Sequence, residues 1–184
     1  MKKSLLASLC VAALALTACD KKTNEAPASS ATTSTSTTTQ PVTASLSSNN
    51  SADIKSDLDQ IQMLSNKNSQ EALGLQNKAN QAAQKGDKAA LTSTVAQMKT
   101  YINKFNQELD ALKLKSSEVN VVRDKIKESN NLGIALAETS LESSPDKQKV
   151  TELQNRAAQL QKELMTEMQA LQNQVKTAPA KTAP

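Results

Sequence analysis

Histidine and tryptophan are absent from this chain of 184 residues, and Tyr101 and Phe105 are its only aromatic residues. Without histidine, the chain lacks the commonest general base and the commonest zinc ligand. Sites that stack sugars or single-stranded bases depend on aromatic faces, so we expect neither a carbohydrate platform nor a single-strand platform. The sequence also contains no phosphate-binding loop, nucleophile elbow or zinc pattern. These absences argue against an enzyme and against a metal or cofactor site.

Carboxylate pairs at helical spacing are the remaining candidates for acid–base chemistry or metal binding. A di-iron helical bundle requires a Glu-x-x-His motif, which a chain without histidine cannot supply. We therefore expect these pairs to form solvent-exposed helix faces that nearby basic residues balance. The pairs are Glu138 with Glu142, Glu163 with Glu167 and Asp124 with Glu128, and their basic neighbours are Lys125, Lys127 and Lys162.

Residues 1–18 have the layout of a secretory signal peptide. A basic start at Lys2 and Lys3 precedes an uncharged, mostly apolar run over 4–17. That run is shorter than the roughly 20 residues that a membrane-spanning helix needs. Removal of the two lysines lowers the net charge of the chain from +4 to +2. The basic pI is therefore no argument for nucleic-acid binding.

The end of this segment, Leu16-Thr17-Ala18-Cys19, resembles the lipobox of bacterial lipoproteins. The resemblance implies cleavage before Cys19 and covalent attachment of a diacylglycerol and an N-acyl chain such as palmitate, with no other cofactor. It also implies a bacterial envelope protein whose body faces the periplasm. Asp20 resembles the inner-membrane sorting signal of enteric lipoproteins, but Lys21 departs from its strongest versions, so inner and outer membrane both stay open. Cys10 lies in the removed segment, and we expect no disulfide.

Residues 19–50 are predicted to be a disordered linker. Serine and threonine dominate this range, Pro27 and Pro41 interrupt it, and it has little apolar mass to bury. A flexible chain of this length has an r.m.s. span of roughly 30 Å and reaches about 100 Å when stretched. A plain spacer is the favoured interpretation, and O-glycosylation at a site such as Ser29 is the alternative.

Residues 51–176 are predicted to be helical, because Leu, Ala, Gln, Lys and Glu dominate this range. Gly86 suits the end of a first helix, and Asp87 suits the N-cap of the second. The second helix carries apolar residues at strict heptad spacing, which is typical of coiled-coil packing. This seam consists of Leu91, Val95, Met98, Ile102, Phe105, Leu109 and Leu112.

Two later boundaries are predicted from capping signals. Ser116 or Ser117 can cap a third helix, although a continuous bent helix through this point stays open. Ser144 as N-cap and Pro145 as first helical residue predict the start of a fourth. The tail over 177–184 contains prolines and is predicted to be disordered.

We expect an all-α fold, an antiparallel bundle of about four helices with coiled-coil-like packing. The alternative fuses the second and third segments into a rod about 84 Å long, which would need an oligomer to cover its apolar stripe. In the antiparallel bundle, Asn68 would lie near the height of Ala157 and Gln159. Those residues would form a buried polar layer or a locally solvated site.

The chain is similar in plan to the small helical lipoproteins of Gram-negative envelopes, including the Braun type, which share a lipidated cysteine and heptad-patterned helices. Braun-type proteins attach to peptidoglycan through a C-terminal lysine. Here Lys181 lies before the final Pro184, and this departure argues against such attachment.

We expect a membrane-anchored lipoprotein with a non-catalytic helical domain that acts as a scaffold or binds proteins. The alternative is a tethered regulator or activator of a cell-wall or membrane enzyme. The expected partners are the membrane, through the lipid, and a second copy or another envelope protein, through the seam. We expect no nucleic acid and no metal.

Overall fold

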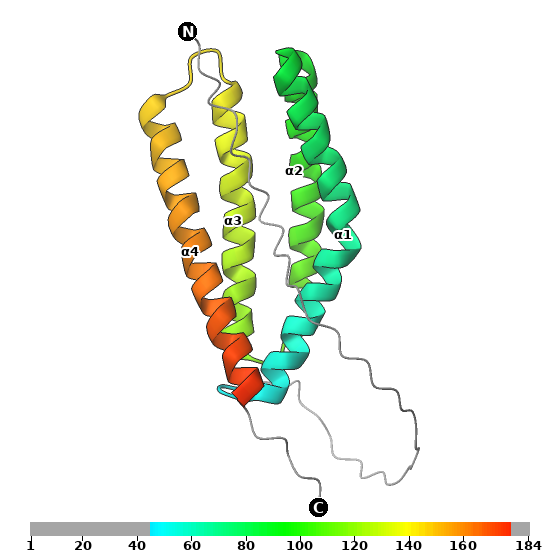
Figure 1. The fold of residues 1–184 in the computed structure, drawn as a ribbon, viewed down its shortest axis with the longest axis vertical. Coiled ribbons are helices and arrows are strands. Elements are labelled where there is room, and N and C mark those ends of the chain that lie inside the picture. The colour runs from blue at the N-terminus through cyan, green and yellow to red at the C-terminus, as the bar shows by residue number, and fades with distance from the viewer. Residues whose placement is uncertain (1–44, 178–184) are drawn as a thin grey trace, which may run out of the picture.

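A computed structural model describes residues 45–177, which form four helices (Figure 1). The helices are α1 (Ser51–Lys85), α2 (Lys88–Asp110), α3 (Ser117–Leu141) and α4 (Lys147–Thr177). They run up and down in alternation, so the predicted all-α antiparallel bundle is confirmed. The predicted signal peptide, Cys19, Asp20, most of the predicted linker and the tail from residue 178 lie outside the described residues.

The first two helices form a hairpin whose ends follow from local capping. Asn50 caps α1, and its side-chain oxygen accepts from the amides of Ala52 (3.1 Å) and Asp53 (3.4 Å). Gly86 ends α1 with a φ of 65°, a left-handed conformation that favours glycine. Asp87 then caps α2 by accepting from the amide of Ala90 at 2.9 Å, as the sequence predicted.

The second and third helices are separate. α2 ends at Asp110, and Ser116 is the N-cap residue of α3, which is one of the two predicted positions, but its side chain makes no capping hydrogen bond. The described chain is therefore not the three-helix arrangement with a fused rod. We define the base as the end of the bundle that holds this connection, the start of α1 and the end of α4, and the tip as the opposite end (Figure 1).

The predicted start of the fourth helix is wrong by two residues. Asp146, not Ser144, caps α4, because its carboxylate accepts from the amides of Gln148 (2.9 Å) and Lys149 (3.3 Å). Pro145 consequently precedes the cap instead of opening the helix. An aspartate can accept from two free amides at a helix start and also places negative charge there.

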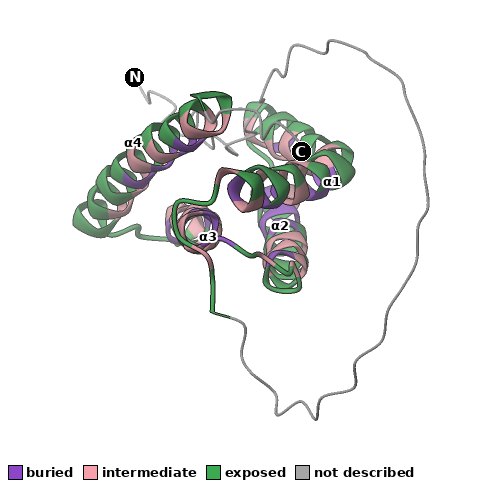
Figure 2. Cartoon of the chain, turned by 90° about the horizontal axis from the view of Figure 1, so that it is seen from below, coloured by how far each residue is buried: buried purple, intermediate pink, exposed green. Residues whose placement is uncertain are grey.

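Buried residues lie mainly on the sides of the helices that face one another (Figure 2), and most of the buried apolar residues belong to two clusters. The base cluster draws on all four helices and contains Ile54, Ile61, Leu64, Leu109, Val119, Val122, Ile126, Leu160, Leu164, Met168 and Leu171. The tip cluster is smaller, with Leu75, Met98 and Ile134 at its centre, and it contains no residue of α4. The bundle is thus a four-helix core at the base and a three-helix core toward the tip.

A layer of polar side chains lies between these clusters. The amide of Asn68 on α1 donates to Glu108 on α2 at 2.9 Å. Between α2 and α3, the side-chain amide of Asn130 donates to Asn106 at 2.9 Å, and that of Asn106 donates to Asn131 at 3.1 Å. Asn68 is the buried member of this layer, and a shifted register would separate it from Glu108.

Asn68 is buried, with only 5% of its surface exposed, as expected for the buried polar layer and not for a locally solvated site. Asn68 makes its side-chain hydrogen bonds within α1 and to α2. It pairs with Glu108, and the Tyr101 hydroxyl donates to its backbone carbonyl at 3.3 Å. The partner of Asn68 comes from α2 because α1 packs with α2 in both clusters, whereas α4 contributes only to the base cluster.

Candidate functional site

The predicted seam on α2 lies inside the described bundle. Leu91, Val95, Met98 and Leu109 are buried, and the other three members are half-buried. Leu109, Phe105 and Leu112 belong to the base cluster, while Met98 and Ile102 belong to the tip cluster. The apolar spacing that we considered as an interaction surface is therefore used to hold the chain's own helices together.

The predicted carboxylate pairs make contacts between helices. Glu163 and Glu167 on α4 both accept from the Lys125 ammonium of α3, at 3.1 Å in the case of Glu163. Glu128 on α3 accepts from Arg156 Nε on α4 at 3.0 Å. Glu138 pairs with Lys99 of α2 at 2.7 Å. Most of these side chains remain partly exposed, so each pair adds little stability but helps to fix which helices are neighbours.

The hydrogen bonds between α3 and α4 shift the pKa values of Glu163 and Lys125. Hydrogen bonds from Lys125 and then Gln159 lower the pKa of the Glu163 carboxyl. Hydrogen bonds to Glu167 and Glu163 raise the pKa of the Lys125 ammonium. Both shifts favour the charged forms at neutral pH. The arrangement is therefore a stable ion cluster and not an acid–base pair held near its point of titration.

We expect Glu163→Gln to weaken the dependence of stability on acid. A carboxyl with a lowered folded-state pKa contributes stability above its unfolded pKa and loses that contribution as pH falls through the folded value. Urea-unfolding midpoints from pH 7 to pH 3 should therefore fall less in Glu163→Gln than in the parent chain. Glu142→Gln, in the exposed connection after α3, is the matched control and should follow the parent curve. Identical profiles for Glu163→Gln and the parent would contradict the assignment.

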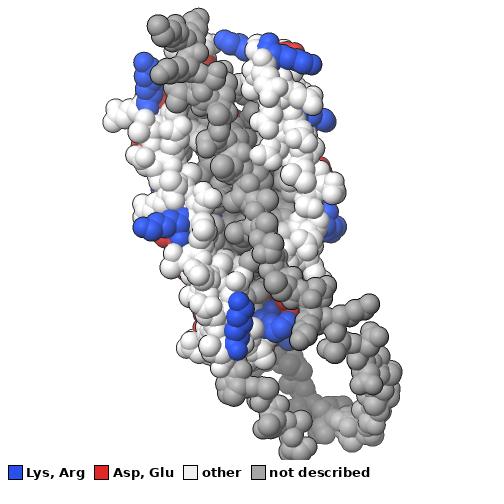
Figure 3. Space-filling model, in the orientation of Figure 1, with Lys and Arg blue, Asp and Glu red and all other residues white. Residues whose placement is uncertain are grey.

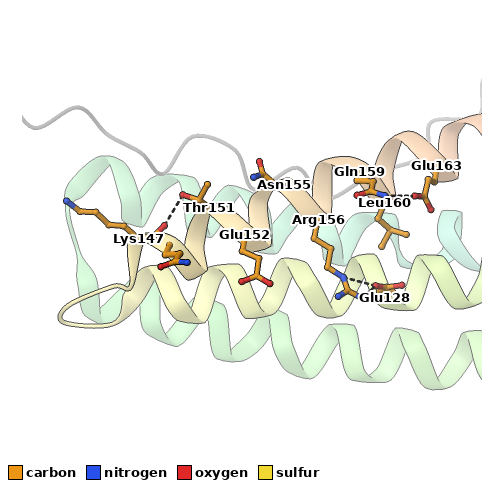
Figure 4. A pocket seen from close by; sticks show the side chains of 10 residues that line it. Glu128, Lys147, Thr151, Glu152, Asn155, Arg156, Gln159, Leu160 and Glu163 are labelled. Atoms are coloured by element: carbon orange, nitrogen blue, oxygen red, sulfur yellow. Dashed lines mark hydrogen bonds and ion pairs between the residues drawn. The ribbon is translucent and has the colours of Figure 1, made fainter.

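A shallow hollow of about 1050 Å³ runs along the tip half of α4 (Figure 4). Its lining is mainly polar and charged, with Glu152, Asn155, Arg156 and Gln159 along one side of the helix. Among the described residues, no cluster of three or more acidic, histidine or cysteine side chains could hold a metal ion. On the face shown in Figure 3, basic side chains are scattered along the edges and do not gather into one patch.

At the base of the bundle, the Asp57 carboxylate accepts three hydrogen bonds from the start of α3. This site was not predicted from the sequence. Asp57 is fully buried. One of its carboxylate oxygens accepts from the backbone amides of Lys115 (2.8 Å) and Ser116 (2.7 Å) and from the Ser116 hydroxyl (2.8 Å). The carboxylate thus satisfies amides at the start of α3, where negative charge is favoured. The available signal was an aspartate at a core position, three residues after Ile54 and four before Ile61.

A short segment before α1 contacts the same connection from another position. The amide of Ser47 donates to the carbonyl of Lys115 at 2.7 Å, and the amide of Ser117 donates to the carbonyl of Ser47 at 2.9 Å. Ser47 and Ser116 form a parallel bridge. The amide of Asn49 donates to Glu118 at 2.7 Å. Residues 45–50, which fall in the range predicted as linker, are therefore bound to the bundle. We call them the strap.

The backbone hydrogen bond from Asn49 is the main cause of a lowered pKa at the Glu118 carboxyl. The strap thus contacts a charged acceptor in the first turn of α3, while Asp57 binds the residues just before that helix. Residues 115–118 are held from α1 and from the chain that precedes α1. The base of the bundle is consequently the point at which the N-terminal part of the protein is attached.

The described residues place the protein in the class of antiparallel four-helix bundles. The first helix starts at the base of the bundle and is preceded in the sequence by a serine- and threonine-rich segment. The family model described as "Uncharacterised lipoprotein PM1805" matches residues 55–176, which is more than half of the chain. The chain belongs to this family of bacterial lipoproteins, and this membership indicates a lipid membrane anchor and a location in the bacterial envelope.

No curated protein and no solved structure matches the chain. Among residues 45–177, no helix combines the length and apolar character needed to cross a bilayer.

Proposed function

We propose that the protein is a lipid-anchored envelope lipoprotein whose helical bundle is a non-catalytic protein-interaction domain. Cys19 carries the diacylglycerol and N-acyl lipid, and the body faces the periplasm. The family match supports the lipoprotein part of this proposal. The chemistry of the described residues supports the non-catalytic part, because the carboxylates of Glu163, Glu128 and Asp57 are bound in ion pairs or to the start of α3.

The observation that carries the interaction proposal is the uneven burial of α4. Leu160, Leu164, Met168 and Leu171 lie in the base cluster and are at most 7% exposed. Toward the tip, the same apolar stripe continues as Val150, Leu153 and Ala157, which are only half-buried. No residue of α4 belongs to the tip cluster. Among the described residues, the tip half of α4 therefore leaves part of its apolar stripe at the surface, and partly exposed apolar surface of this kind can take part in protein binding.

The placement of the seam bears on the two kinds of partner considered. A self-assembling scaffold built on the α2 seam would need that seam at the surface, whereas the bundle uses it internally. This favours the tethered module, in which the bundle meets a different envelope protein. A regulator or activator of a cell-wall or membrane enzyme is one such module, and the linker would let it search the space near the membrane.

Photo-crosslinking in cells tests this proposal. A photoreactive residue replaces Leu153 on the half-buried stripe, and the matched control replaces Gln161, which is exposed on another side of α4. We expect a discrete product at position 153, of a mass that corresponds to the chain plus a different protein, and no such product at 161. A product with twice the mass of the chain would instead support self-association. Equal products at both positions would contradict a binding surface on this stripe.

A further inference from the structure

The strap and Asp57 together raise the question of how force from the membrane reaches the fold. The chain enters the bundle at residues 45–50, and the first structured contacts it makes are with the α2–α3 connection, not with α1. Sequence order alone would place the first load on α1, because α1 follows the strap directly. Helix ends fray readily, so a pull on the first turn of α1 would be expected to peel that helix from its end.

We propose that the strap is a mechanical clamp, through which tension in the lipid tether is passed to the start of α3 and bypasses α1. The proposal rests on the lipid anchor proposed above. Any pull on residue 44 reaches Ser47 before Asn50, the cap of α1. At Ser47 it is opposed by two backbone hydrogen bonds, to Lys115 and from Ser117. At Asn49 it is opposed by the bond to the Glu118 carboxylate.

Residues 115–118, which accept the load in this clamp, are firmly held by the bundle. Ser116 is fully buried, and its amide and hydroxyl both donate to the buried Asp57 carboxylate. The connection is flanked by Leu109 at the end of α2 and Val119 in the first turn of α3, each with 0% of its surface exposed. Load transferred to residues 115–118 is therefore passed to the four-helix base cluster, the most extensively packed part of the bundle.

The clamp also explains why Asp57 belongs to α1. The carboxylate fixes the connection from inside the bundle, while the strap holds it at the surface. Ser47 and Asp57 thus both bind the stretch 115–117. The N-cap of α1, Asn50, lies between Ser47 and Asp57 in the sequence. Because the cap lies inside this loop, tension applied outside the loop does not act on it until the strap bonds break.

Single-molecule pulling tests the clamp, and the sequence makes the chemistry simple. Residues 20–184 contain no cysteine, so a pair of introduced cysteines gives unique attachment points. One pair, Ser30→Cys with Lys176→Cys, pulls through the strap. The other pair, Ser56→Cys with Lys176→Cys, applies force directly to α1 and not through the strap. It is the control for the first pair. Ser47→Pro removes the donor to Lys115, and Ser45→Pro is the control proline two residues earlier.

In the Ser30 geometry, Ser47→Pro should speed rupture at a given load by about tenfold, as expected for the loss of one or two net hydrogen bonds. In the Ser56 geometry, Ser47→Pro should match the parent. Ser45→Pro should match the parent in both. Equal effects of Ser47→Pro in the two geometries, or no effect in the Ser30 geometry, would overturn the clamp.

A second variant protects the test from a folding defect. If circular dichroism shows that Ser47→Pro loses helix, Glu118→Ala replaces it, because this change removes the acceptor of the Asn49 amide and leaves the strap backbone intact. The same difference between geometries is expected. These measurements use the unlipidated chain, so their failure would refute the clamp without touching the lipid anchor, which membrane fractionation tests separately.

Discussion

Replacing Asp57 with alanine is expected to lower the free energy of unfolding by about 2–4 kcal/mol. The substitution leaves the amides of Lys115 and Ser116 and the Ser116 hydroxyl without their acceptor, and these groups lie in a part of the bundle from which water is largely excluded. Each buried donor that loses its partner keeps its full desolvation cost. Urea unfolding of residues 20–184, followed by circular dichroism, measures the change.

Asp59→Ala is the matched control for this prediction. Asp59 lies two residues further along α1, but its carboxylate is exposed and pairs with Lys55 in the next turn toward the N-terminus. An exposed pair of this kind contributes roughly 0.3–0.5 kcal/mol. If Asp57→Ala cost no more than Asp59→Ala, the carboxylate would not be holding the start of α3, and the mechanical clamp would lose its inner contact as well.

Loss of the lipid is expected to move the protein almost completely from the membrane to the soluble periplasmic fraction. Each buried methylene of an acyl chain contributes about 0.8 kcal/mol to membrane binding, and two or more chains are needed for stable anchoring. In the parent chain, labelled palmitate should be incorporated, and the protein should resist extraction by salt and by alkali. Residues 20–184, exported behind an ordinary cleavable signal peptide, should incorporate no label and should remain soluble.

The exported form is needed because a simple Cys19→Ser change leaves the uncleaved signal peptide on the chain, and its apolar run could itself hold the protein at the membrane. Circular dichroism of the exported form supplies the folding control. Palmitate-free parent protein, or an exported form that stays with membranes after salt and alkaline washes, would show that something other than the lipid on Cys19 retains the chain.

The features that sequence analysis predicted well are those with short-range causes. Gly86 ends α1 because only a residue without a side chain adopts its conformation easily, and Asp87 and Ser116 mark the next two helix starts. The heptad spacing from Leu91 to Leu112 correctly indicated close helix packing. It could not indicate whether the neighbour would be another helix of the same chain or a second copy, because both satisfy the same periodicity.

The features that were missed depend on contacts between distant parts of the chain. Asp57 lies in an apolar stripe, and its role becomes visible only when the α2–α3 connection is placed against it, more than fifty residues away. Asn68 was expected near the height of Ala157 and Gln159, but its partner was not identified. In the structure, α4 leaves α1 above the base, so α2 supplies its partner Glu108. Local spacing does not determine how far two helices stay together.

Because α1 begins and α4 ends side by side at the base, the height of the tip above the attachment point depends only on helix length (Figure 1). Seven residues added to each partner of a hairpin, on the tip side of the polar layer, would keep the heptad spacing and raise that hairpin by about 10 Å. The strap, Asp57 and the base cluster would be unaffected. The height of the tip and the attachment of the bundle to the preceding chain are therefore set by separate parts of the fold.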